Sequence, residues 1–359
     1  MKKLYQILVL VGVLLFLVGA VLFCVAMTQE DWDFSRLSDT QVEQITYTEP
    51  TGETYDRVEL CFANSDVEII FEECDTLTLE YPKLTDRRGR AKNEVHLTKE
   101  ENGITVIEEI FWYRNWLSIF NFADPKVKLH LPKDRVWELS IFTDNGEILV
   151  ETNDQKGEDG KVLTDGAVSH TKNFHISSDN GDVFFLDTSY LVCDEHFSVH
   201  TDNGDVQLGV VHAGSLYVET DNGEVGLWGG KVDGDVALLS DNGDIRLYGA
   251  LSAATLEVTT SNGEIIFGEA LRATEVTVES NNGGIYFASV DATVLTIESD
   301  NGDVQASLVG NRPDYSIDVE TDNGDANVED QISYSSPRVL RVETDNGDID
   351  ILFLGNAKQ

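Results

Sequence analysis

The sequence predicts an all-β protein: a single-stranded β-solenoid (β-helix) of rungs with Asp-Asn-Gly turns, preceded by one N-terminal transmembrane helix. Three observations predict it. A turn related to Asp-Asn-Gly-Asp recurs ten times, and its spacing of about 20 residues is typical of repeat architectures. Around each turn, apolar and polar residues alternate, which is the period of a β-strand with one buried face. The chain also begins with a long uncharged apolar run.

The apolar run occupies residues 4–27 and is long enough to cross a hydrocarbon core of roughly 30 Å. Lys2 and Lys3 precede it and acidic residues follow it, so the positive-inside rule places residues 1–3 in the cytoplasm. A cleaved signal peptide is the alternative, although its apolar core is usually only roughly 7–15 residues. We therefore expect a single-pass signal anchor in the cell membrane, with the C-terminal domain extracytoplasmic.

The rest of the chain divides by its pattern. Residues 28–53 are polar and aperiodic, which predicts a linker. Residues 54–135 are predicted to form the irregular first strands of the solenoid, with an aromatic insertion at 111–122. Residues 136–353 are predicted to form the regular repeats, and 354–359 a tail. The strand-like runs of the irregular part are 57–62, 67–71, 76–81, 94–98, 104–108 and 126–131.

The turn is predicted to be structural. Asn and Gly tolerate positive φ, so we expect them to allow a sharp reversal. The residue two before Asn is Thr or Ser in all ten copies. Its parity points inward, where its hydroxyl can bond backbone groups at a buried corner. The predicted turn residues are Asn145, Gly146, Asn180, Gly181, Asn203, Gly204, Asn222, Gly223, Asn242, Gly243, Asn262, Gly263, Asn282, Gly283, Asn301, Gly302, Asn323, Gly324, Asn346 and Gly347.

Two arrangements of the repeat fit the alternation. Each unit could be a hairpin of one antiparallel sheet, or one coil of a solenoid whose rungs share a core. A two-residue hairpin would set Asp144 opposite Glu147 and Asp179 opposite Asp182, and like charges directly opposite are destabilising. The near-constant period also favours the solenoid.

The composition limits the function. The chain has 65 acidic and 25 basic side chains and a formal charge of −40, which argues against a nucleic-acid partner. In a solenoid the turn carboxylates form columns that repel each other, and Ca²⁺ or Mg²⁺ could bind there weakly. The alternative is a solvated column that only confers solubility. No other cofactor is predicted. The candidate cation ligands are Asp179, Asp182, Asp202, Asp205, Asp221, Glu224, Asp241, Asp244, Asp300, Asp303, Asp322, Asp325, Asp345 and Asp348.

Histidines and cysteines give weaker signals. His175 is expected to lie in line with Ser198 and Tyr217, and His200 with Ser177 and Glu219. Zinc binding or general-base catalysis would need two or three of the histidines to lie together, and the sequence does not indicate this. Cys61 and Cys74 could form a disulfide, or they could be small apolar fillers.

An aromatic run and a basic island precede the regular repeats. Seven of the twelve residues of FWYRNWLSIFNF are aromatic, and KLTDRRGRAK lies upstream. Aromatic residues prefer the bilayer interface and basic clusters attract anionic lipid, so we expect this end to rest on the membrane. The alternative is that the aromatics cap the solenoid core. The candidate interface residues are Phe111, Trp112, Tyr113, Trp116, Phe120, Arg87, Arg88 and Arg90.

The anchor-like start, the segment KVKLHLPKDRVWELSIFTDNGEI and the repeated DNGD turns resemble an uncharacterised putative-adhesin family of bacterial β-strand-repeat envelope proteins. That family is similar to the β-helical head domains of putative autotransporter adhesins. The resemblance covers roughly residues 55–353 and implies surface binding or an accessory role in envelope stress. It supplies no catalytic residues. The many rungs and the insertion near Phe111 depart from the family pattern.

The sequence thus predicts a membrane-anchored, non-catalytic binding or scaffold protein of the cell envelope. Its partners would be a cell-wall polymer, a glycan or an envelope protein. A stress accessory that binds no ligand is the second reading. A polysaccharide-acting β-helix enzyme is the third, but it would need a singular acid cluster, whereas these acids repeat with the scaffold.

Overall fold

The computed structural model describes residues 40–111, 125–152, 168–186 and 189–355, with short pieces between residues 16 and 28. The chain divides into two compact units. The first contains Met1–Gln44, Pro82–Glu94 and Ile110–Pro125, and the second contains Ile45–Tyr81, Val95–Glu109 and Lys126–Gln359. Within the described residues, no helix has both the length and the apolar character needed to span a membrane. Most of the predicted span 4–27 lies outside them.

Four early strands contribute residues to both units. They are β1 (Thr40–Thr48), β4 (Thr78–Asp86), β5 (Asn93–Lys99) and β6 (Gly103–Ile110). β1 falls inside the predicted linker 28–53, so the end of that segment is a strand and not a linker. Most residues of β1 are exposed, which is why its sequence carries no clear apolar alternation.

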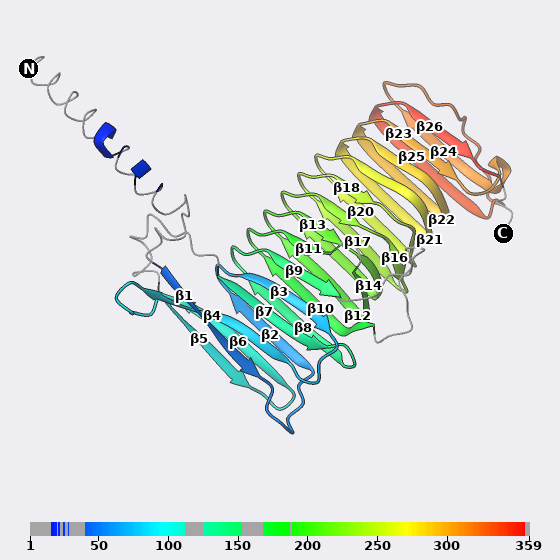
Figure 1. Cartoon of the computed structure of the whole chain (residues 1–359). Coiled ribbons are helices and arrows are strands. Elements are labelled where there is room, and N and C mark those ends of the chain that lie inside the picture. Colours follow the sequence, from blue (N-terminus) through cyan, green and yellow to red (C-terminus); the bar gives the residue numbers. More distant parts are fainter. Residues whose placement is uncertain are drawn as a thin grey trace, which may run out of the picture. The chain divides into compact units, whose positions relative to one another are not determined.

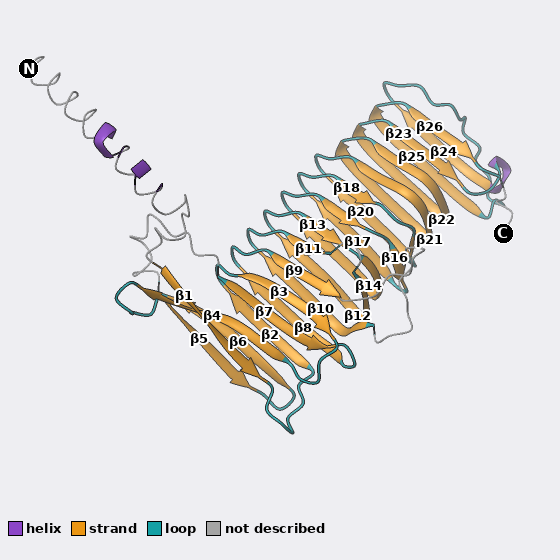
Figure 2. Ribbon diagram, viewed as in Figure 1, coloured by secondary structure: helices purple, strands orange, loops and turns teal. Residues whose placement is uncertain are grey.

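The second unit is a β-solenoid (Figures 1 and 2). Each regular rung has up to three strand segments, which stack in parallel on those of neighbouring rungs and form three faces. The first face leads into the turns, the second follows them, and the third connects back. The sequence indicated only the first two, because the third has segments as short as Leu251–Ser252.

The strands of the faces have the following bounds. The first face contains β6, β2 (Arg57–Phe62), β8 (Val136–Thr143), β10 (Ser169–Ser178), β12 (Tyr190–Thr201), β14 (Val210–Thr220), β17 (Asp235–Ser240), β20 (Thr255–Thr260), β24 (Tyr315–Thr321) and β25 (Arg338–Asn346). The second contains β7 (Lys126–Pro132), β3 (Asp66–Glu72), β9 (Ile148–Thr152), β11 (Val183–Phe185), β13 (Val206–Leu208), β15 (Val225–Leu227), β18 (Ile245–Leu247), β23 (Val304–Leu308) and β26 (Ile349–Phe353). The third contains β16 (Gly230–Val232), β19 (Leu251–Ser252) and the first residues of β10, β12 and β14, while β21 (Ile265–Asn282) and β22 (Ile285–Asn301) bend through all three faces.

The alternation of apolar and polar residues in the sequence matches the alternation of buried and exposed side chains in the strands. Leu216 pairs with Val236, which pairs with Leu256, and all three are buried. Aromatic residues stack in the same way: the rings of Phe267 and Phe287 lie 4.3 Å apart and nearly parallel. Each inward residue therefore packs on its equivalent one rung away, and the rungs share one continuous core.

At the C-terminal end the order in space differs from the order in the chain (Figure 1). β25 pairs with β22 on one side and with β24 on the other, although it follows β24 in sequence. β26 likewise pairs with β23. The last rung of the chain is therefore the penultimate rung of the stack. A loop covers the outer edge of β24. The backbone of Gln331 in this loop exchanges two hydrogen bonds, of 3.0 and 2.9 Å, with the backbone of Ile317 in β24.

The same inversion occurs at the other end. β2 pairs with both β6 and β8, and β3 pairs with both β7 and β9. The first rung of the chain thus lies between the second and the third. Between β6 and β7, residues 112–124 lie outside the described residues.

Candidate functional site

The asparagines of the turns form a ladder of side-chain amides along the solenoid. In each link, Nδ2 of one Asn donates to Oδ1 of the Asn in a neighbouring rung, at 2.9–3.1 Å. The ladder begins at Asn64, which the sequence analysis missed because Ser65 replaces the glycine. At its far end the order is Asn301, Asn346, Asn323, which follows the inverted rungs. Asn is therefore required for its side chain.

The turn glycines are required for space and not for their backbone angles. We expected positive φ, but none of the ten has φ in the left-handed region. A Cβ at Gly223 would lie 2.0 Å from the carbonyl oxygen of Gly204, and one at Gly243 would lie 1.8 Å from that of Gly223. The corners stack so closely that no side chain fits between them.

The inward Thr and Ser hydroxyls behave as predicted. Thr201 Oγ1 donates to the Gly181 carbonyl at 3.1 Å, and Thr220 Oγ1 to the Gly204 carbonyl at 3.0 Å. Both side chains are buried. Thr143 is the exception, since its buried hydroxyl has no partner in the described structure. This column is thus a buried hydrogen-bonded spine, incomplete at the rung next to Ser65.

The carboxylates after the glycines also serve the scaffold. Asp205 Oδ1 accepts the backbone N–H of Glu224 at 2.8 Å, and Asp244 Oδ1 accepts that of Glu264 at 2.7 Å. Four further links are Asp66 to Glu147, Asp182 to Asp205, Asp303 to Asp348 and Asp348 to Asp325. Only the acids that are Asp make this bond. One oxygen of each such acid is therefore already used.

The predicted cation ligands lie in columns along the turns. In the described part of the chain no group of three or more His, Cys, Asp or Glu side chains is arranged to hold a metal ion. Glu224 and Asp244 bind Arg246 instead, at 2.6 and 2.5 Å. One hollow near the C-terminal end gathers Asp303, Asp325, Asp348 and Asp350, and has a volume of about 340 Å³. Weak cation binding along this edge remains a prediction.

The histidines lie in the columns that were predicted. His175 pairs with Ser198 and Ser198 with Tyr217, while His200 lies between Ser177 and Glu219. His175 Nδ1 is 2.8 Å from Ser198 Oγ. Burial, and then the neighbouring His200, lower the pKa of His175. These contacts link neighbouring rungs on an outer face.

The three described cysteines outside the N-terminal pieces are free thiols. Cys61 and Cys74 do not form the disulfide that was one alternative, and Cys193 is buried. Burial raises the pKa of all three thiols, which agrees with a role as small apolar fillers.

The basic island is a turn built around one acid. Asp86 Oδ1 accepts the N–H groups of Arg88 and Arg90, and its Oδ2 binds the Arg90 side chain at 2.6 Å. The backbone bond from Arg90 helps lower the pKa of Asp86 to about 2. Arg87, Arg88 and Arg90 are exposed, and Phe111 donates its N–H to the Lys92 carbonyl at 3.0 Å. Trp112, Tyr113, Trp116 and Phe120 lie outside the described residues, so the membrane interface stays a prediction.

A surface that the sequence analysis missed lies on the second face. Trp228 and Tyr248 stand on consecutive rungs with ring centroids 5.1 Å apart, and they are 43% and 39% exposed. Tyr248 Oη donates to Glu224 Oε1 at 2.8 Å, and Glu224 also binds Arg246. We call Trp228 and Tyr248 the aromatic platform. Its signal in the sequence was the run Gly226-Leu-Trp-Gly-Gly, which interrupts the repeat.

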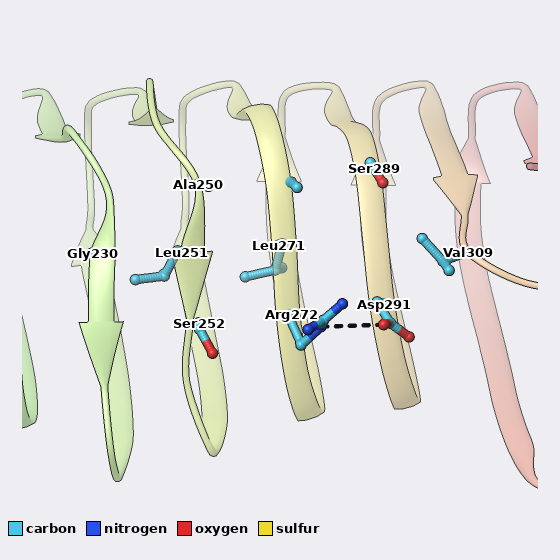
Figure 3. A pocket seen from close by; sticks show the side chains of 10 residues that line it. Gly230, Ala250, Leu251, Ser252, Leu271, Arg272, Ser289, Asp291 and Val309 are labelled. Atoms are coloured by element: carbon cyan, nitrogen blue, oxygen red, sulfur yellow. Dashed lines mark ion pairs between the residues drawn. The ribbon is translucent and has the colours of Figure 1, made fainter. Parts of the chain in front are cut away.

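A shallow trough lies along third-face segments of the solenoid (Figure 3). Its volume is about 310 Å³, and it crosses several rungs. Small side chains line it at Ala250, Ala270 and Ser289. Arg272 and Asp291 form an ion pair of 3.3 Å along it. Gly230 and Ala250 of the trough follow Trp228 and Tyr248 by two residues each.

One family model and several solved structures are similar to this chain. No curated protein matches it. A family model described as Toastrack DUF4097 matches residues 55–289. A putative adhesin from Parabacteroides distasonis is 12% identical, with 87% of this chain and 98% of that chain covered and a TM-score of 0.45. A putative adhesin from Parabacteroides merdae is 13% identical, with coverages of 88% and 96% and a TM-score of 0.41. A putative lipid binding protein from P. distasonis is 14% identical, with coverages of 75% and 93% and a TM-score of 0.29.

Proposed function

The chain belongs to the Toastrack DUF4097 family, and from that premise we propose that it is a membrane-anchored, extracytoplasmic binding protein of the adhesin type, without catalytic activity. The resemblance to an uncharacterised putative-adhesin family is confirmed. That name describes the relatives, and its extension to this chain is part of the proposal.

One observation carries the proposal: the repeated side chains are used by the scaffold, whereas exposed aromatic side chains gather on an outer face. Turn Asn, Gly and Asp residues contact the neighbouring rung. Trp228 and Tyr248, at the ends of second-face strands, are instead 43% and 39% exposed. Aromatic residues are enriched at interfaces, where one part of the ring is apolar and the other is wet.

Two other classes of function remain alternatives. An enzyme acting on polysaccharide would need a singular acid pair in a cleft, and the hollow of Asp303, Asp325, Asp348 and Asp350 is the place to test it. Asn327 already donates to Asp350 there, which favours a scaffold role. A stress accessory would bind no envelope component at all.

The anchor is the second part of the proposal. Residues 4–27 would cross the cell membrane, with residues 1–3 inside and the solenoid outside. Cells that express the chain with a C-terminal epitope should lose the epitope when protease is added to spheroplasts. An epitope that is cut only after lysis would contradict this topology.

Binding is tested with the full chain in detergent and isolated bacterial envelopes. We expect saturable sedimentation of the chain with the envelopes, and equal sedimentation for a variant with the Asp350→Asn change. Periodate oxidation and protease digestion of the envelopes then separate glycan from protein partners. Absence of saturable binding would overturn the adhesin-type function, and release of reducing sugar during the incubation would favour the enzyme.

A further inference from the structure

We propose that the aromatic platform of Trp228 and Tyr248, with its polar rim, is a binding site for a neutral glycan chain. The inference rests on the proposed binding function and names the surface and the ligand class. Sugar rings present flat C–H faces that pack on aromatic rings and hydroxyl groups that need hydrogen-bonding partners. The platform offers both kinds of contact side by side.

The platform is held in place before any ligand arrives. Arg246 lies between Glu224 and Asp244, at 2.6 and 2.5 Å, and Glu224 accepts the Tyr248 hydroxyl at 2.8 Å. The rings of Trp228 and Tyr248 are inclined by 32°. Tyr248 therefore loses little conformational freedom on binding, which favours affinity.

Both rings are also open along the solenoid. In the neighbouring rungs, Gly209 and Gly268 stand at the position of Trp228 and Tyr248 after the inward residues Leu208 and Phe267. Neither glycine has a side chain to cover a ring. A chain of sugars can thus approach the platform from either direction along the axis.

The rim carries an amide with no partner. Gln207 pairs in register with Gly226, which pairs with Arg246. Its side chain lies over the glycine, since a Cβ at Gly226 would be 2.0 Å from Gln207 Oε1. The Gln207 side-chain amide makes no hydrogen bond to any of the described residues. It can donate to and accept from sugar hydroxyls, and the carboxylates of Glu224 and Asp244 can accept further bonds.

A trough on the third face includes Gly230 and Ala250, which follow the platform residues by two positions each in the chain (Figure 3). Its small side chains leave room next to the backbone over several rungs. Arg272 lies along it and can donate to hydroxyl groups, while Asp291 is held by both Arg272 and Arg338, at 3.3 and 2.8 Å. A linear chain that starts on the platform could follow this path across the rungs. The trough sets the direction of the ligand, while the platform supplies the contact energy.

Charge and size select the ligand class. The formal charge of −40 disfavours an anionic polymer. A stable protein partner buries roughly 800 Å² on each side around an apolar centre, whereas this apolar surface consists of two half-exposed rings. A neutral saccharide needs one or two stacking rings and a polar rim, which is what these rungs provide.

The test measures binding of neutral hexasaccharides of glucose and of N-acetylglucosamine to the full chain in detergent, by calorimetry. We expect at least one of them to bind, and Trp228→Ala and Tyr248→Ala to weaken binding roughly tenfold or more. Gln207→Ala should weaken it about fivefold. The matched control is Tyr286→Ala, which removes a ring that is 43% exposed on the same face but outside the pair, and it should change affinity less than about twofold.

Each outcome decides the proposal. Failure of both saccharides, or equal binding by wild type and the Trp228→Ala and Tyr248→Ala variants, overturns the glycan site. If these variants still sediment with bacterial envelopes, the chain has the proposed binding function but its binding site lies elsewhere on the molecule. If the variants abolish binding to protease-sensitive or anionic envelope material instead, the platform serves a different partner class and the glycan assignment is wrong. Melting curves of Tyr248→Ala provide a folding check.

Discussion

The turn edge and the aromatic platform lie on the same rungs but use their side chains differently. At the edge, Asn222 bonds to Asn203 and Asn242, and every rung repeats this contact. At the platform, Trp228 and Gly226 occur in one rung only. The comparison teaches that repetition in this chain marks contacts between rungs, whereas departures from the repeat mark surfaces that are free to meet a partner.

The largest loss of stability is expected when one methyl group is added to a turn glycine. A Cβ at Gly283 would lie 1.9 Å from the Gly263 carbonyl oxygen, so Gly283→Ala should lower the free energy of unfolding by about 3 kcal/mol. The adjacent Gly284 is the control, because its Cβ would meet nothing nearer than the Asp303 carbonyl oxygen at 3.4 Å. Thermal and urea unfolding of both variants measures the difference, and equal effects would contradict the space argument.

The buried hydroxyl column gives the next largest effect. Thr201→Val removes the hydrogen bond to Gly181 and should cost about 1 kcal/mol of unfolding free energy. Thr143→Val removes a buried hydroxyl that has no partner in the described structure, so it should be neutral or stabilising. The two substitutions are chemically identical, and urea unfolding should show a loss of stability for Thr201→Val alone. A loss of stability in both would mean that Thr143 also makes a bond.

The outer faces should respond weakly to pH. The pKa of His175 is lowered by burial and by His200, so its folded-state pKa lies below the unfolded value of about 6.5. The unfolded chain then binds more protons as the pH falls through this value, and the melting temperature should decline from pH 7 toward pH 5. His175→Asn should flatten that decline. An unchanged slope would assign the pH dependence to other groups.

The smallest effect is expected from cations at the acidic edge. Ca²⁺ or Mg²⁺ that binds only the folded chain should raise the melting temperature by a saturable amount. The shift should disappear in the variant Asp202→Asn, Asp205→Asn, Asp221→Asn, Glu224→Gln. Asn at position 205 keeps an oxygen for the Glu224 N–H, so the fold is preserved. A shift no larger than that of NaCl at equal ionic strength would leave the edge as scaffold alone.

Much of the fold could be predicted because its signals are local. Alternation identified the buried column of Leu216, Leu256 and their equivalents, and parity placed the inward hydroxyls. The inverted ends could not be predicted, because each rung offers the same contacts and the sequence does not say which rung meets which. The role of the glycines was misjudged for a related reason. The angle φ is a property of one residue, whereas the lack of space for a Cβ, which would lie 1.8–2.2 Å from a carbonyl oxygen of the neighbouring rung, depends on two rungs.

The candidate site was harder to predict than the fold. Glu224 and Asp244 were assigned to cation binding from their place in the repeat, and their ion pairs with Arg246 appear only when rungs are set in register. Trp228 and Tyr248 are separated by a full rung in sequence, so their contact also depends on stacking. A search for residues that break the repeat would have found Gly226 and Trp228.

The inverted ends determine how the solenoid would carry a mechanical load. In a simple stack, a pull on either terminus peels off the outermost rung, one hydrogen bond after another. Here β25 lies between β22 and β24, and β26 lies between β23 and the segment 325–327, whose backbone bonds that of Ile349. A force applied to the C-terminal end must shear these strands from two neighbours at once, so many hydrogen bonds bear the load together. β2 and β3, which form the first rung of the chain, likewise lie between two neighbours each, so this rung resists peeling in the same way.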